Sequence, residues 1–125
     1  MTTCQAYAIL TILGKVAEGT VIYFIHEFDR RLDVSHAQMV KSYAQMAEGW
    51  QKAWPSNRLI GFFSRRYSLG AGTEYMAVWE MPNFAAFDEW QGTWQQVKGV
   101  MQPAEEGFHG AVLNERSRVM EKLLP

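Results

Sequence analysis

The residue best suited to chemistry in this chain is His26, which lies inside the apolar run TVIYFIHEF at residues 20–28. Its β-branched and aromatic residues predict a buried strand, and alternation places Ile22, Phe24 and Phe28 on the same strand face as His26. An apolar setting disfavours a charged imidazole, so His26 is expected to be a neutral base at pH 7. It could take a proton from a phenol, a carbon acid or a hydroxyl. A core histidine satisfied by a tyrosine hydroxyl or a carbonyl is the equally weighted alternative.

Two tyrosines could complete a site around His26. Tyr43 belongs to a segment with helical spacing of apolar residues, and Tyr75 belongs to an aromatic strand that also carries Trp79. The two phenols are expected to approach one cavity, where each could donate to a developing oxyanion or orient His26. Trp79 would form a wall that stacks on a flat ligand. The alternative for all three is plain core packing, with tethered tyrosine hydroxyls.

Two charged residues are candidates for substrate binding. Arg66 shares strand parity with Phe62, and its guanidinium could bind a ligand carboxylate in a bidentate manner. Asp88 lies at the edge of an apolar helical stripe. For both residues the alternative is a solvated position.

Three glutamates alternate toward the opposite sheet face, namely Glu27, Glu74 and Glu80. A glutamate buried there would need an arginine partner, and Arg65 is available.

The histidines and the cysteine do not form a metal-ligand pattern. His26, His36 and His109 are dispersed, and Cys4 stands alone, so neither a zinc site nor a disulfide framework is expected. A haem needs one histidine and is kept as a lesser alternative. The sequence therefore predicts no metal and no cofactor.

Composition sets the protein class. A chain of 125 residues forms one domain, and a net charge of −1 without a basic stripe argues against nucleic-acid binding. No apolar run is long enough to cross a membrane, and no signal peptide is visible. The single cysteine fits a cytoplasmic location.

The predicted elements alternate between strands and helices. A capping box at Thr2 predicts a helix over residues 1–19, although this stretch also has strand character. Ser35 and Asn83 are predicted N-caps, and Pro55 and Gly99 mark the two helix ends. We expect strands at 20–28, 59–67, 74–81 and 108–116, a Gly-rich hairpin turn at 68–72, a loop between Pro103 and Gly107, and a short helix or arm at 117–124.

This order predicts an α+β fold, the ferredoxin-like βαββαβ unit, with a four-stranded antiparallel sheet and helices on one face. The domain would span residues 20–116, with an N-terminal helix or arm at 1–19 and a tail at 117–125. The bare sheet face carries Val21, Tyr23 and Ile25, which are too apolar for water. A second copy of the chain is the expected cover, which predicts a homodimer.

On these residues the chain resembles the dimeric α/β-barrel superfamily, in which two ferredoxin-like subunits pack their sheets into a barrel. The segment NRLIGFFSRRYSLGAGTEYMAVWEMPNFAAFDEW is similar to NIPSNAP proteins, and its strand end is similar to antibiotic-biosynthesis monooxygenases. The segment FIHEFDRRLDVSHAQMVKSY resembles small polyketide cyclases of the olivetolic-acid-cyclase kind.

The resemblance implies which side chains line a pocket. Trp79 matches the tryptophan of the cofactor-free monooxygenases, whereas their asparagine four residues earlier is Tyr75 here. The cyclases' tyrosine and histidine on the second helix fall near Asp88 and Trp94, so that pair is not matched. The implied pocket residues are Ile22, Phe24, His26, Phe28, Met39, Tyr43, Tyr75, Ala77 and Trp79.

The sequence thus predicts a cofactor-independent enzyme that acts by proton transfer on a hydrophobic, oxygenated or aromatic, polyketide-like small molecule. Cyclase, lyase or isomerase chemistry is preferred because the oxygenases' asparagine is replaced. The alternatives are a non-catalytic NIPSNAP-like binding or interaction protein, a cofactor-free monooxygenase and a haem-binding member.

Overall fold

The computed structural model describes residues 20–67 and 70–124, except for the side chains of residues 67, 70, 71 and 93–102. The predicted helix or arm at residues 1–19 and the turn residues 68 and 69 lie outside this description. The elements follow in the order β1 (Ile22–Arg30), α2 (His36–Ala53), β2 (Arg58–Tyr67), β3 (Gly70–Met81), α3 (Phe84–His109) and β4 (Val112–Glu121).

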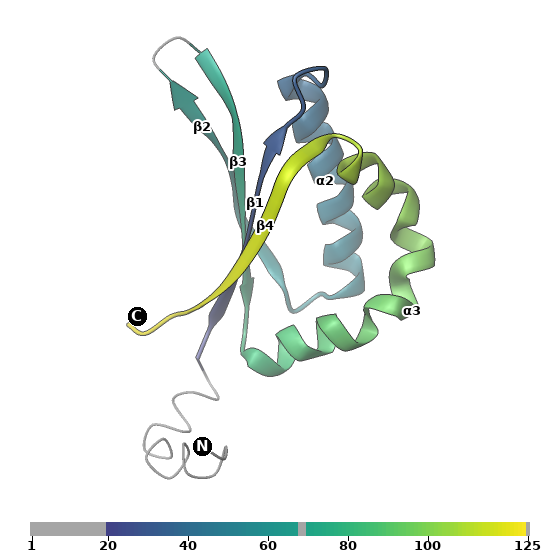
Figure 1. Ribbon diagram of the computed structural model, residues 1–125. Helices are drawn as coiled ribbons and strands as arrows, with labels where there is room; N and C mark the ends of the chain where they lie inside the picture. The colour runs from purple at the N-terminus through teal and green to yellow at the C-terminus, as the bar shows by residue number, and fades with distance from the viewer. Residues whose placement is uncertain (1–19, 68–69, 125) are drawn as a thin grey trace.

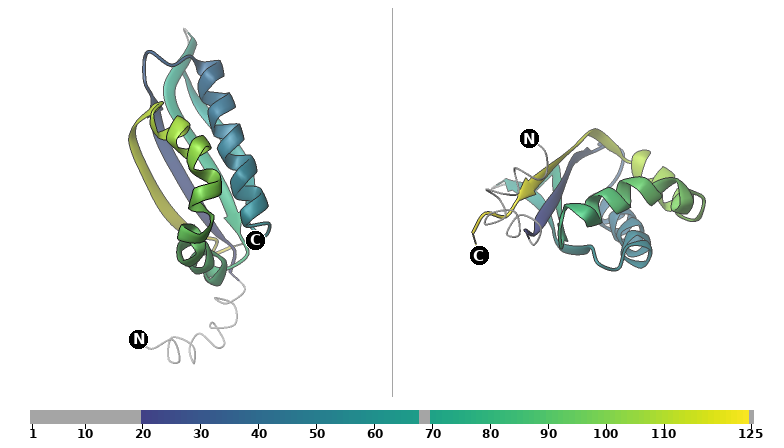
Figure 2. Two further views of the ribbon diagram at one scale, coloured as in Figure 1. Left: turned by 90° about the vertical axis from the view of Figure 1, so that its right-hand side faces the viewer. Right: turned by 90° about the horizontal axis from the view of Figure 1, so that it is seen from below.

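The four strands form one antiparallel sheet in the order β2-β3-β1-β4. Helices α2 and α3 cover one face of this sheet, and the described chain leaves the other face open (Figures 1 and 2). This arrangement confirms the predicted ferredoxin-like βαββαβ fold. None of the helices in the described part of the chain is long and apolar enough to span a membrane.

Helix α2 begins where its capping residues predict. The hydroxyl of Ser35 accepts from the Gln38 N–H at 3.1 Å, and the Gln38 side chain accepts from the Ser35 N–H at 2.7 Å. This reciprocal pair satisfies two backbone donors that the first turn leaves free. The face that α2 buries carries Met39, Tyr43, Met46, Ala47 and Trp50.

Helix α3 is longer than the sequence suggests. Asn83 caps it as predicted, since its side chain accepts from the Ala86 N–H at 2.9 Å. The expected helix end near Gly99 and the expected loop at Pro103 are wrong, because the helix continues to His109. A proline inside a helix bends it without necessarily ending it. Figure 1 shows α3 changing direction, so that its second half runs alongside α2.

Strand β4 begins and ends later than the predicted strand at 108–116. Phe108 belongs to α3 and is fully buried. Residues predicted to form a tail instead pair with β1, from His26↔Ser117 to Ile22↔Glu121. The edge strand therefore extends to Glu121, five residues beyond the predicted strand end.

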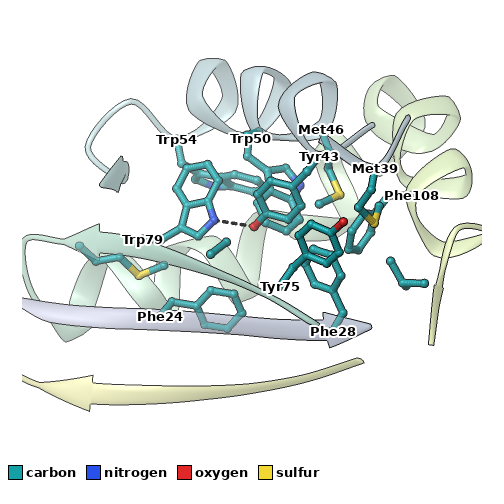
Figure 3. Packing of buried hydrophobic residues seen from close by; sticks show 14 of the residues in the cluster. Phe24, Phe28, Met39, Tyr43, Met46, Trp50, Trp54, Tyr75, Trp79 and Phe108 are labelled. Carbon is teal, nitrogen blue, oxygen red and sulfur yellow. Dashed lines mark hydrogen bonds between the residues drawn. The ribbon is translucent and has the colours of Figure 1, made fainter. Parts of the chain in front are cut away.

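The core lies between the sheet and the helices and is dominated by aromatic rings (Figure 3). Alternation along β1 and β3 supplies its sheet side. The fully buried side chains of largest volume are Tyr43, Phe28, Phe108, Ile22, Met39 and Met46.

On the open face, each of the three predicted glutamates has an arginine partner. The pairs are Arg58–Glu80 at 2.8 Å, Arg65–Glu74 at 3.0 Å, and Glu27 with Arg118 at 3.2 Å and Arg116 at 3.5 Å. Exposed pairs of this kind contribute little stability, at most about 1 kcal/mol each.

Candidate active site

A pocket of about 410 Å³ lies on the helix side of β1 and β4. Its volume is within the range of about 300–1,000 Å³ that small-molecule sites occupy. Aromatic rings and convergent polar groups line it together: Phe24, His26, Trp50, Trp90, Gln91, Glu105, Glu115, Arg116 and Ser117.

Glu115, which lines this pocket, lies in β4 at a β-bulge. The β1–β4 register shifts between the pairs Glu27↔Arg116 and Asp29↔Leu113, so β4 has one extra residue there. Asn114 in the bulge has φ 53°, a left-handed conformation that asparagine tolerates better than most residues. Bulges of this kind redirect side chains beside functional sites. Glu115 has the parity of Ser117, which is opposite His26, so it shares the helix-facing side with His26, and the bulge changes the parity of the residues before it, Val112 and Leu113.

His26 and Glu115 form a close pair. The Nε2 atom of His26 lies 2.6 Å from Oε2 of Glu115. The imidazole is buried, with 4% of the residue exposed, whereas a third of the Glu115 side chain is exposed. A ligand entering the pocket would therefore meet the carboxylate first, with the imidazole behind it.

Behind His26 lies Tyr43, which extends the chain of hydrogen bonds into the core. The Tyr43 hydroxyl is 3.4 Å from Nδ1 of His26 and accepts from the Trp79 indole N–H at 3.0 Å, the bond drawn in Figure 3. One arrangement of hydrogens satisfies all contacts. Trp79 donates to Tyr43, the Tyr43 hydroxyl donates to Nδ1 of His26, and the Nε2–H of His26 donates to Glu115.

Burial keeps the Tyr43 phenol protonated. Desolvation strongly raises the pKa of this hydroxyl, and the nearby Glu115 and Glu105 carboxylates raise it further, against the opposing Trp79 hydrogen bond. Tyr43 therefore acts as a donor that fixes the tautomer of His26. It contributes to positioning and does not line the pocket.

Glu115 is held in its ionised form. The hydrogen bond from His26 lowers the pKa of Glu115 below its ordinary value of 4.5, outweighing a desolvation that raises it. His109, at the end of α3, contributes in the same direction with Nδ1 3.0 Å from Oε1 of Glu115. The carboxylate thus lies between two imidazoles.

Glu105 is the second carboxyl group of the pocket, and its environment acts in the opposite direction. Burial raises the pKa of Glu105, partly offset by the hydrogen bond that the Trp50 indole donates at 2.9 Å. Nε2 of His109 lies 3.6 Å from Oε2 of Glu105. Two carboxyl groups in one pocket with pKa values shifted apart are typical of acid–base sites.

These shifts predict opposite pH dependences of stability. The folded-state pKa of Glu115 is below its unfolded value. Its contribution to folding stability is therefore present above about pH 4.5 and is lost as pH falls through the folded-state pKa. The folded-state pKa of Glu105 is raised, so its contribution is present at low pH and is lost as pH rises. Thermal unfolding should show Glu115→Gln less stable than wild type at neutral pH, with the difference vanishing in acid.

Glu105→Gln is the matched comparison for that experiment. Its amide oxygen can still accept from Trp50, so it should equal or exceed wild-type stability at neutral pH and lose that advantage as pH falls. Melting-temperature differences that move in the same direction with pH for both variants would contradict these assignments.

The structure places Tyr75 away from His26, although both were expected at one cavity. The Tyr75 hydroxyl accepts from Nε of Arg30 at 3.1 Å and lies 2.8 Å from Nδ1 of His36. This cluster borders smaller pockets of about 150 and 350 Å³. The separation arises because Tyr75 pairs with Phe28 in the β1–β3 register, whereas Ala77 is opposite His26.

The other predicted pocket residues divide into lining, core and exposed positions. Phe24 lines the main pocket, while Trp79 borders a smaller one behind it. Phe28 and Met39 are fully buried core, and the ring of Phe62 stacks on Tyr43 with centroids 4.5 Å apart. Arg66 and Asp88 are exposed and do not line the main pocket. Their binding roles stay predictions.

Sequence reasoning missed Glu105, Glu115 and His109 as site residues. Strand parity with Ser117 could have indicated Glu115, but only once the β1–β4 register is known. Glu105 and His109 fell in a segment predicted as loop and strand. Their spacing of four residues is the helical signal that placed both on one face.

The described residues contain no cluster of three or more His, Cys, Asp or Glu side chains able to hold a metal ion.

Comparisons with known proteins give fold matches alone. No protein-family model matches the chain, and no curated protein matches its sequence. A variant of SnoaB, a cofactor-independent oxygenase from Streptomyces nogalater, superimposes with a TM-score of 0.60 at 11% identity, over 84% of this chain and 95% of that chain. A NIPSNAP-like domain protein from Burkholderia xenovorans gives 0.57 at 16% identity over 86% of each chain.

A third solved structure is described as a dimeric protein of ferredoxin-like fold from Bacteroides fragilis. It gives a TM-score of 0.54 at 11% identity, over 82% of this chain and 96% of that chain. At these identities the likeness establishes the fold alone, and that fold is the ferredoxin-like one that the Bacteroides fragilis protein is described as having.

Proposed function

We propose that this protein is a cofactor-independent enzyme that transfers protons within a hydrophobic, oxygenated aromatic small molecule. One observation carries the proposal. An ionised carboxylate, Glu115, lies at the wall of an aromatic pocket with the N–H of a buried imidazole 2.6 Å behind it. This arrangement supplies a base and a hydrogen-bond donor at one point.

The proposed reaction begins with removal of a proton from a carbon next to a substrate carbonyl. The proton moves to Glu115, and the electron pair of the broken C–H bond moves through the new C=C bond onto the carbonyl oxygen. Protonation of Glu115 weakens its hold on the Nε2–H of His26, which can then donate to the enolate oxygen. Return of the proton at another position completes an isomerisation. Attack of the enolate carbon on a second carbonyl moves the C=O electron pair onto that oxygen, which takes the proton back from Glu115 and completes a cyclisation.

The pocket walls favour a flat aromatic substrate. Phe24 and Trp90 meet edge to face with centroids 4.9 Å apart, and Trp50 meets Trp90 at 5.7 Å. Such walls offer large apolar contact area together with the polarised edges and faces of aromatic rings.

Hydrogen exchange tests this proposal without knowledge of the natural substrate. Anthrone is a flat tricyclic ketone with an acidic CH₂ group, and its exchange of hydrogen for deuterium in D₂O can be followed by mass spectrometry under argon. The protein should accelerate exchange above the buffer rate. Binding of anthrone without acceleration would favour the non-catalytic, NIPSNAP-like alternative.

The fold likeness to SnoaB makes a cofactor-free monooxygenase the second candidate. The same assay in air separates the two functions. An oxygenase would consume dioxygen and convert anthrone and O₂ to anthraquinone and water, whereas a proton-transfer enzyme would accelerate exchange without added oxygen uptake.

We also propose that the open sheet face pairs with a second copy of the chain. Its exposed apolar side chains include Phe63, with 52% of the residue exposed, and Met120, with 50% exposed. The arginine–glutamate pairs on this face could exchange partners across a two-fold interface. The likeness to a protein described as dimeric supports this assembly.

Replacing Val78 by Arg should dissociate that dimer. Val78 is opposite Ile25 on the open face, near the middle of the sheet, and is partly exposed in the single chain. A charge there would be buried without a partner in the dimer but solvated in the monomer. Light scattering should give a monomer mass for Val78→Arg and a dimer mass for wild type. An unchanged mass would place the interface elsewhere.

A further inference from the structure

A second, much smaller cavity adjoins the main pocket, with walls dominated by indole rings. Its volume is about 10 Å³, room for no more than about one water molecule. The lining residues are Phe24, Trp50, Trp54, Asn57, Trp79, Met81 and Trp90, named here the tryptophan box.

Asn57 is the unexpected member of the tryptophan box. Only 4% of the residue is exposed, and its side-chain oxygen is buried without a hydrogen-bond partner. Its backbone does not explain the residue type, since Asn57 is not among the described residues with positive φ. The backbone N–H of Asn57 donates to the Trp54 carbonyl, and its backbone carbonyl accepts from the Gln51 side chain. Neither hydrogen bond requires an amide side chain at position 57. A buried acceptor of this kind destabilises the fold unless a ligand or water pairs with it.

The box and the main pocket share a wall made of Phe24, Trp50 and Trp90. Phe24 and Trp50 are buried, and the Trp50 indole is bonded to Glu105. Trp90 alone of the three is partly exposed. Trp90 is therefore the member of the shared wall whose rotation could connect the main pocket with the tryptophan box.

We propose that Trp90 is a movable partition and that the tryptophan box binds the far ring of an elongated aromatic ligand, whose hydroxyl donates to Asn57. This inference rests on the proposed function, which places the reacting carbonyl of the ligand beside Glu115. It specifies the substrate class further, as a fused-ring molecule with a phenolic hydroxyl at the end opposite its reacting carbonyl.

A matched ligand pair tests the role of Asn57. 2-Hydroxyfluorene and 2-methylfluorene have nearly the same shape, but only the first can donate a hydrogen bond. By titration calorimetry, wild type should bind the hydroxyl compound about five- to tenfold more tightly, the ratio that one net hydrogen bond provides. Asn57→Leu should remove this preference and keep or raise the melting temperature, while Ser56→Ala, at an exposed neighbour, should change neither.

Trp90→Ala tests the partition. With the indole gone, stopped-flow mixing should show faster association of both fluorenes than for wild type. Unchanged association rates, equal affinities of the two compounds for wild type, no binding of either, or a hydroxyl preference that persists in Asn57→Leu would overturn the inference.

The outcomes are separable from those of the proposed function because binding requires no turnover. If Glu115→Gln leaves hydrogen exchange unchanged but Asn57→Leu abolishes the hydroxyl preference, the ligand site stands and the proposed chemistry fails. If Glu115→Gln slows hydrogen exchange but the hydroxyl preference persists in Asn57→Leu, the ligand site is overturned and the proposed chemistry stands.

Discussion

Glu115→Gln is expected to lower the rate of anthrone hydrogen exchange by about 10²- to 10⁴-fold, the usual contribution of a positioned base. The substitution preserves size and still allows an oxygen to accept from Nε2 of His26, at the 2.6 Å contact seen in the structure. It removes the negative charge that would take the proton. Initial rates in D₂O, measured on protein shown by circular dichroism to be folded, check this expectation.

Glu105→Gln is the control within the same pocket. Glu105, like Glu115, lines the pocket and lies beside His109. Its carboxyl group, however, accepts a hydrogen bond from the Trp50 indole and not from His26. It should retain most of the exchange rate. Equal losses in the two variants would show that general charge in the pocket, and not the pair of Glu115 with His26, determines the rate.

His26→Gln distinguishes the structure-based assignment from the sequence-based one. A glutamine there can donate to Glu115 and accept from Tyr43, so an effect much smaller than that of Glu115→Gln is expected if the carboxylate is the base. If His26→Gln abolishes exchange while Glu115→Gln does not, the imidazole alone is the base, as its position in an apolar strand predicted.

The sequence indicated His26 because residue type and strand parity suffice to find an unusual polar group in an apolar strand. They could not indicate Glu115. Glu115 has the strand parity of Ser117, but its place beside His26 depends on the β1–β4 register, in which Ser117 is opposite His26. That register is set by pairing between two strands far apart in the chain, as the separation of 89 residues between His26 and Glu115 illustrates.

Much of the fold was predictable because the signals that start its helices are local in the sequence. Local signals such as the Ser35 capping box and the Asn83 cap depend on a few neighbouring residues, and the structure confirms them. Pro103 was misread because proline is a strong local helix breaker, whereas α3 continues through it to His109 and changes direction along its length (Figure 1). That error moved the predicted start of β4 and hid the spacing of Glu105 and His109.

The hydrogen bonds from Trp79 through Tyr43 and His26 to Glu115 join the site to the hydrophobic core. Tyr43 belongs to both, since its hydroxyl orients His26 and its ring stacks on Phe62 at 4.5 Å. Phe28 holds this arrangement from the sheet side. Its ring is fully buried and packs against Tyr43 at 5.6 Å and, edge to face, against Phe108 at 4.8 Å.

Phe28→Ala should therefore be the most destabilising single change considered, with a loss of about 3–5 kcal/mol. Removing the ring leaves a cavity among side chains that α2, α3 and the sheet hold in place, so relaxation can fill little of it. Against a total stability of about 5–15 kcal/mol, the melting temperature should fall by roughly 10–25 °C. Phe84→Ala is the control, because Phe84 is 44% exposed at the start of α3 and should cost far less. Comparable losses in the two variants, measured by denaturant unfolding, would mean that the aromatic cluster around Phe28 is not the centre of the core, and the placement of Tyr43 and His26 would then need another support.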